Sequence, residues 1–179
     1  MTVADAQREV RTVFVGGAVG QGVSAVVWLV SAVAGSQVST AGGILVLVVG
    51  GAFIFPLTVA VLRLAGRPAA LDPANPLSSL ARQVAFVVPL LLPLAGAAAI
   101  HRIEWFYPAM MLIVGAHYLP FVFLYGMPAF YALGGGLLAM GMLLGLEVGP
   151  LAGAPWTTGG WVTGAALLAF AVWAGMAYG

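Results

Sequence analysis

Long runs of apolar residues constrain the fold of this chain more than any other feature of its sequence. The stretches 42–62 and 84–94 contain no Asp, Glu, Lys or Arg. A helix needs about 20 apolar residues to cross the hydrocarbon core of a bilayer. A spanning β-barrel would instead need segments of roughly ten residues that alternate apolar and polar side chains. Because the runs are continuous, the sequence predicts membrane-spanning helices.

The composition supports this interpretation. Hydrophobic residues make up 63% of the chain, charged residues only 6%, and the mean hydropathy is +1.10. Soluble proteins carry roughly 25% charged residues, because a surface in water needs them. We therefore predict an all-α, polytopic transmembrane helical bundle that forms a single domain over residues 1–179. The exclusive use of Arg among basic residues, with abundant Ala, Gly, Val and Leu, suggests a bacterial source.

About six spans are expected, and the connections between them are short except for residues 66–82. The predicted spans are 12–35, 42–65, 83–100, 105–125, 129–147 and 159–178. The first resembles a secretory signal, with Arg8 and Arg11 before an apolar stretch. It is longer than a usual signal core and is interrupted by Gln21, so we interpret it as a retained helix.

The arginines predict the orientation, because cytoplasmic loops carry an excess of positive charge. One side receives five of them and the other side only Arg102; the five are Arg8, Arg11, Arg63, Arg67 and Arg82. Both termini are therefore expected in the cytoplasm, with the protein in the inner membrane. Arg63, Arg67 and Arg82 could also bind anionic lipid headgroups, although setting the topology explains the same residues.

Small residues and prolines suggest how the helices pack. In lipid, helices associate through close contact of small residues. The candidate pairs are Gly16 with Gly20, Gly141 with Gly145, and Gly160 with Gly164. Prolines inside three spans, at positions 56, 89, 93 and 120, each free a backbone carbonyl and either kink the helix or help to open a pocket.

His117 is the one ionisable residue predicted deep within a span, which makes it a functional candidate. A neutral imidazole there could bind a ligand, carry protons, or simply form a hydrogen bond between helices. Buried glutamines usually join helices but can also contact a ligand. The candidate ligand-binding residues are His117, Tyr118, Phe121, Tyr125, Gln21 and Gln83.

The remaining polar residues offer little chemistry. His101 and Glu104 could pair as acid and base on one helical turn, although interfacial charges are ordinarily solvated. With two histidines and no cysteine, we expect neither a metal nor another cofactor. The formal net charge of +1 and the lack of a basic run predict no nucleic-acid partner. Signatures of P-loop ATPases, zinc proteases and serine hydrolases are missing.

Two stretches resemble a known family. The first runs Gly-Gly-Ala-Phe-Ile-Phe-Pro-Leu over residues 50–57 and leads to Gly-Arg-Pro at 66–68. The second contains Trp-Phe-Tyr-Pro at 105–108 and continues from Gly115 to Gly126 through His117, Tyr118 and Pro120. Together they resemble a bacterial family of small multi-span membrane proteins classed as a domain of unknown function. That resemblance implies membrane placement and no transferable site residues.

Three functions remain open on these observations. The favoured hypothesis is a protein that binds or transports a small apolar molecule or a lipid near His117. A second is a structural or accessory subunit that forms a homo-oligomer, or binds another membrane protein, through its glycine-rich faces. A third, less favoured, is an enzyme that acts on a lipid-soluble substrate, with His117 or the His101–Glu104 pair as acid and base.

Overall fold

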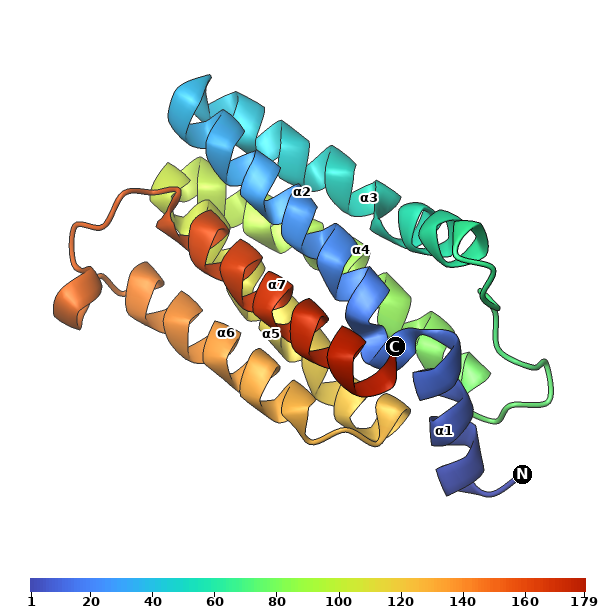
Figure 1. Ribbon diagram of the computed structural model, residues 1–179. Coiled ribbons are helices and arrows are strands. Elements are labelled where there is room, and N and C mark those ends of the chain that lie inside the picture. The colour runs from blue at the N-terminus through green and yellow to red at the C-terminus, as the bar shows by residue number, and fades with distance from the viewer.

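A computed structural model describes residues 1–179, except for the side chain of Pro150, and over these residues all regular secondary structure is helical. Seven α-helices run along the bundle shown in Figure 1. They are α1 (Val3–Val13), α2 (Ala18–Gln37), α3 (Thr40–Leu64), α4 (Ser78–His101), α5 (Phe106–Tyr125), α6 (Ala129–Gly145) and α7 (Thr158–Tyr178). Short 3-10 helices η1 (Val15–Gly17), η2 (Ile103–Trp105) and η3 (Gly149–Leu151) lie between them. The predicted helical fold class is confirmed.

Five helical segments are long and apolar enough to cross a membrane, namely Val15–Gln37, Thr40–Leu64, Ser78–His101, Ile103–Tyr125 and Thr158–Tyr178. Helix α6 is shorter, with 17 residues. At 1.5 Å per residue it is roughly 25 Å long, slightly less than the typical hydrocarbon thickness of about 30 Å. Each predicted span thus corresponds to an apolar helix, and the passage of these helices through the bilayer, that of the short α6 above all, stays a prediction.

The first predicted span is broken near its start. Val15, Gly16 and Gly17 have φ values of 53°, 60° and 89°, in the left-handed region that interrupts a helix. Residues 12 and 13 therefore belong to α1 rather than to the span that follows. The third predicted span is longer than expected, because α4 begins five residues before position 83. The prolines inside α3, α4 and α5 end none of these helices.

Helix α1 is an amphipathic helix that the sequence analysis did not anticipate. Its N-terminus carries a capping box, in which Thr2 and Asp5 each bond the backbone of the other. The hydrogen bonds from Thr2 hold the pKa of the Asp5 carboxyl below its ordinary value. On its inner face, Gln7 Nε2 donates to the carbonyl of Phe123 at 2.6 Å, and Arg11 donates to that of Tyr125. Helix α1 therefore adds donors to carbonyls of the last turn of α5, where the regular helical hydrogen bonding ends.

The long connection between α3 and α4 is also fixed to α1. Asn75 is 2% exposed, and its Nδ2 donates to Glu9 at 2.9 Å and to the carbonyl of Ala6 at 3.2 Å. The second Glu9 oxygen accepts from the backbone N–H of Asp72 at 2.6 Å. In Figure 1, α1 and both termini lie at the same end of the bundle. Hydrogen bonds thus fasten α1 and the connection together beneath that end.

The transmembrane helices divide into an inner and an outer set. Helix α2 packs along both α3 and α7, and α5 packs along α4 and α6. In α2 and in α5, half of the residues in the apolar stretch of the helix are buried within the protein. In α3 and in α4, only 11% of them are buried. The core therefore lies around α2, α5 and α7, whereas α3 and α4 turn most of their apolar side chains outward.

Glycines allow the closest helix contacts. A Cβ at Gly115 of α5 would lie 2.9 Å from the carbonyl oxygen of Gly134 on α6. Two predicted small-residue pairs are confirmed at helix contacts, because Gly141 and Gly145 face α5, Gly164 faces α2, and Gly160 faces both α2 and α5. The glycines of the third pair, Gly16 and Gly20, face α7 and α3 but do not share one helix. Gly16 lies in the break before α2, where a Cβ would meet the ring of Tyr178.

Candidate functional site

The predicted candidates on α2 and α5 meet in the protein interior. The hydroxyl of Tyr118 donates to Oε1 of Gln21 at 2.6 Å, and both side chains are buried. The aromatic rings of Phe121, Tyr125 and Phe130 surround this pair and contact one another at centroid distances of 5.1–5.5 Å. This group of side chains forms the contact between α2, α5 and α6.

His117 lies at the edge of this aromatic group and is half-buried. Its ring contacts those of Phe121 and Tyr118 at centroid distances of 4.9 and 5.5 Å. Its Nδ1 is covered by protein and has no hydrogen-bond partner among the described residues. The two cavities described below have other linings, so neither provides the pocket expected beside His117.

Two other expectations do not hold in the three-dimensional arrangement. Gln83 is exposed on the surface of α4, and its amide contacts only Ser79, at 3.4 Å, in the described hydrogen bonds. His101 and Glu104 share no helical turn, because α4 ends at His101 and the backbone is extended at Arg102. Glu104 faces Arg102 instead, at 3.9 Å, while the His101 ring contacts Trp105.

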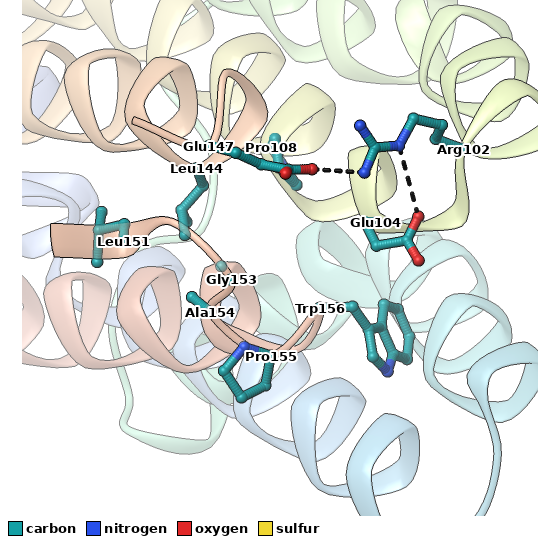
Figure 2. A pocket seen from close by; sticks show the side chains of 11 residues that line it. Arg102, Glu104, Pro108, Leu144, Glu147, Leu151, Gly153, Ala154, Pro155 and Trp156 are labelled. Atoms are coloured by element: carbon teal, nitrogen blue, oxygen red, sulfur yellow. Dashed lines mark hydrogen bonds and ion pairs between the residues drawn. The ribbon is translucent and has the colours of Figure 1, made fainter. Parts of the chain in front are cut away.

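A charged cavity lies at the end of the bundle opposite α1, and we call it the rim cavity. Arg102 follows α4 and contacts Glu104 on η2 and Glu147, just beyond α6, with 2.5 Å between Arg102 Nη2 and Glu147 Oε1. Figure 2 shows Arg102 between the carboxylates of Glu147 and Glu104, with Leu144, Leu151 and Ala154 on the side of the cavity away from Arg102. Its volume is about 230 Å³.

The charged groups of the rim cavity are available to solvent or ligand. The side chains of Arg102, Glu104 and Glu147 are 44%, 53% and 45% exposed. Ion pairs this exposed contribute only about 0–1 kcal/mol to stability. A ligand with matching charges can therefore replace them at little cost. Two carboxylates against one guanidinium leave the cavity with one net negative charge.

Glu147 occupies an unusual backbone position. It has φ 54° directly after α6, and the following N–H, of Val148, bonds back to the carbonyl of Leu143 at 3.2 Å. Such a helix end normally places glycine at the left-handed residue. A side chain in this conformation is strained, and such strain is often found at functional positions. The strained residue here carries one of the two carboxylates of the rim cavity.

A second cavity of about 230 Å³ lies beside the rim cavity, between α4, α5 and α6; we call it the side groove. Its lining is apolar and includes Trp105, Leu112 and Met142, while Pro108 borders both cavities. The guanidinium carbon of Arg102 lies 5.5 Å from the centroid of the Trp105 ring. The charged rim and the apolar groove are therefore neighbours.

Sequence reasoning found the separate residues of this region but not the cavity. Glu104 lies just before the fourth predicted span, Trp105 begins that span, and Glu147 ends the fifth. The contact between Arg102 and Glu147 joins residues 45 positions apart, so no local sequence pattern predicts it. The glycine-type conformation at Glu147 likewise has no signature in the sequence.

The fold defines a class, a small all-helical bundle with five helices long and apolar enough to cross a membrane. Over residues 3–176 the chain matches the family of unknown function DUF7010, and it belongs to that family. The resemblance to a family of unknown function is thus confirmed. No curated protein and no solved structure matches the chain.

Proposed function

We propose that the protein is a membrane-embedded binding protein for an amphiphilic small molecule or lipid, whose polar end occupies the rim cavity. The observation that carries this proposal is the rim cavity itself. It has a volume of about 230 Å³, and Arg102, Glu104 and Glu147 line it together with apolar side chains. A mostly apolar cavity with a few convergent polar groups is the usual form of a small-molecule site. We thus locate binding at the rim rather than beside His117.

The position of the cavity favours an amphiphile over a fully apolar ligand. It lies where α4, α5, α6 and α7 begin or end, next to Trp105 and Trp156. Tryptophan concentrates at membrane–water interfaces, where one end of a molecule is wet and the other is in hydrocarbon. A ligand held there can present a polar group to the three charges and keep its apolar part in the bilayer.

The charge balance favours a cationic group on the ligand. The two carboxylates attract such a group, and the Trp156 ring adds an aromatic wall to the same cavity. Arg102 can pair with an anionic group of the same ligand. The geometry therefore supports amine-bearing amphiphiles over purely anionic ones.

Native mass spectrometry after gentle extraction from the membrane tests this proposal. We expect a small molecule to remain on the wild-type protein and to be lost from Glu147→Gln and Arg102→Gln. Arg63→Gln is a matched control, because Arg63 is an exposed arginine in the last turn of α3. A ligand retained equally by all variants would contradict binding at the rim, and a ligand-free wild type would contradict binding altogether.

A second candidate site surrounds His117, where the unpartnered Nδ1 offers a polar contact for a small apolar ligand or a substrate. His117→Ala in the same experiment distinguishes the two sites. Loss of the ligand from this variant alone would favour the interior site, to which Tyr118, Phe121, Tyr125 and Gln21 would contribute. The roles of accessory subunit and enzyme would then need separate tests of assembly and turnover.

We further propose that the protein lies in the inner membrane of a bacterium with both termini in the cytoplasm. Five of the six arginines belong to α1, the end of α3, the start of α4 and the connection between them. The rim cavity has only Arg102, with Glu104 and Glu147. The positive-inside rule then assigns the α1 end to the cytoplasm and the rim cavity to the outer face.

A further inference from the structure

We propose that the side groove holds an acyl chain of the same lipid whose headgroup occupies the rim cavity, with an ester carbonyl of that lipid bonded to the indole N–H of Trp105. This inference rests on the proposed function and names its ligand class. That class is a diacyl glycerophospholipid with a zwitterionic amine headgroup.

The sizes of the two cavities favour one ligand that spans both. Each measures about 230 Å³. Sites that enclose a whole drug-sized ligand typically measure about 300–1,000 Å³. Each cavity is therefore large enough for only part of a lipid. Pro108 lines both, so a molecule with its headgroup in one can place a chain in the other.

The lining of the side groove matches an acyl chain. Leu112 and Met142 give it apolar walls, and the absence of side chains at Gly141 and Gly145 leaves α5 and α6 close together beneath it. The groove opens outward beside α4, a helix whose apolar side chains are mostly exposed. A chain can thus enter sideways from the bilayer.

Trp105 supplies the specific contact. Its Nε1 is covered by protein and has no acceptor among the described atoms, although an N–H out of water normally has one. The Trp105 side chain already lines the groove. In a diacyl phospholipid the ester carbonyls lie between headgroup and chains, which corresponds to the position of Trp105 between Arg102 and Leu112. When the indole turns its N–H into the groove, an ester carbonyl provides the missing acceptor.

The headgroup follows from charge complementarity at the rim. An ammonium group pairs with Glu104 and Glu147, and the adjacent phosphate pairs with Arg102. Phosphatidylethanolamine has this arrangement of charges. Phosphatidylglycerol lacks the ammonium group and would leave both carboxylates without a partner on the ligand.

The test compares the affinities of purified protein for three probes by titration in native mass spectrometry. The probes are diacyl phosphatidylethanolamine, its dialkyl ether analogue, which lacks ester carbonyls, and chainless glycerophosphoethanolamine. We expect wild-type protein to bind the diacyl lipid roughly three- to tenfold more tightly than the ether, as one net hydrogen bond predicts. Trp105→Phe should bind the two lipids equally, and the chainless probe should bind far more weakly.

Two further variants keep the test independent of misfolding. Trp161→Phe is the matched control at the same end of the bundle, since Trp161 is 42% exposed and lines neither cavity. It should retain the wild-type preference. Ala98→Leu keeps the indole but fills the groove, so it should weaken binding of both lipids.

Each other result overturns the inference in a distinct way. Equal binding of ester and ether lipids by wild-type protein, or a preference that survives Trp105→Phe, would exclude the carbonyl contact. If glycerophosphoethanolamine binds as tightly as the diacyl lipid, no acyl chain occupies the groove. The same conclusion follows if the Ala98→Leu variant binds both lipids as tightly as wild-type protein does. If both lipids bind and Glu147→Gln abolishes binding, the proposed function survives these failures. If no probe binds wild-type protein, this inference fails, and the proposed function then stands or falls on whether the protein extracted from its membrane retains any other ligand.

Discussion

Tyr118 and Gln21, 97 residues apart, share a buried hydrogen bond of 2.6 Å that joins α5 to α2. Closer to the rim, the hydroxyl of Ser31 on α2 contacts that of Tyr107 on α5 at 2.6 Å and donates to the carbonyl of Gly43 on α3 at 2.7 Å. Polar side chains thus connect α2 and α5 at two levels. In hydrocarbon, where apolar burial gains little, such bonds specify which helices are neighbours.

Replacement of Tyr118 by Phe should destabilise the fold by about 0.5–2 kcal/mol, because the Gln21 carbonyl loses its donor. Unfolding in mixed micelles measures this difference. Tyr131→Phe is the control, since Tyr131 is 61% exposed on α6. The double variant Tyr118→Phe, Gln21→Leu should recover part of the loss. A single variant as stable as wild type would show that the bond contributes nothing.

Replacement of Glu147 by Gly should leave the fold as stable as wild type or more stable by roughly 1 kcal/mol, because glycine adopts φ 54° without strain. The same change should abolish ligand retention at the rim cavity. Glu147→Gln keeps the strain and removes only the charge, so it should lose ligand without gaining stability. Thermal unfolding and native mass spectrometry report the two properties separately. A Gly variant that keeps its ligand would refute the role of the carboxylate.

Replacement of Gly115 by Ala should destabilise the contact between α5 and α6 by about 1–3 kcal/mol. The added methyl would lie 2.9 Å from the Gly134 carbonyl oxygen and 3.0 Å from Leu138, so the helices must separate. Gly135→Ala is the matched control, because its added methyl would have no atom of another helix within 4 Å. The comparison requires only unfolding curves. Equal stability of the two variants would mean that the close approach is not needed.

Replacement of Asn75 by Ala should loosen the attachment of α1 to the connection between α3 and α4, since Asn75 Nδ2 makes two hydrogen bonds to α1 and its Oδ1 accepts a third within the connection. The hydrogen bond from the Asp72 N–H to Glu9 would remain. Hydrogen–deuterium exchange should accelerate in residues 3–13 and 66–77 while α5 and α7 keep their protection. Arg8→Gln is the control, because Arg8 is exposed and its side chain contacts only Asp5 in the described ion pairs. Uniform acceleration throughout the chain would point instead to global destabilisation.

Single cysteines should establish the topology directly, since the chain contains no cysteine of its own. We expect Ala70→Cys and Pro128→Cys to react with a membrane-impermeant thiol reagent only from the cytoplasmic side. Val148→Cys, beyond α6, should react only from the opposite side. Labelling of whole cells and of inverted vesicles distinguishes the two. If positions 128 and 148 react from the same side, α6 does not cross the bilayer and the six-span prediction is wrong.

Part of the candidate site could be predicted from the sequence. His117, Tyr118, Phe121 and Tyr125 recur at helical spacing on α5, so their proximity follows from local geometry. Gln21 was identified as a polar residue within an apolar run, and it does meet Tyr118. Gln83 satisfied the same criterion, yet it is exposed on α4. Polarity within a span therefore did not reveal which face of the helix points inward.

The amino-acid sequence by itself determined the class of this protein. Hydrocarbon sets the length of an apolar helix, and each helix satisfies its own backbone hydrogen bonds, so both features can be read from local residues. Only the tertiary structure decided that α3 and α4 face outward, that α1 is fastened beneath the bundle, and that Arg102 meets Glu147. In a bilayer, inner and outer faces are equally apolar, so hydropathy does not distinguish them. Close packing of small residues and a few long-range polar contacts instead determine which face of each helix points inward.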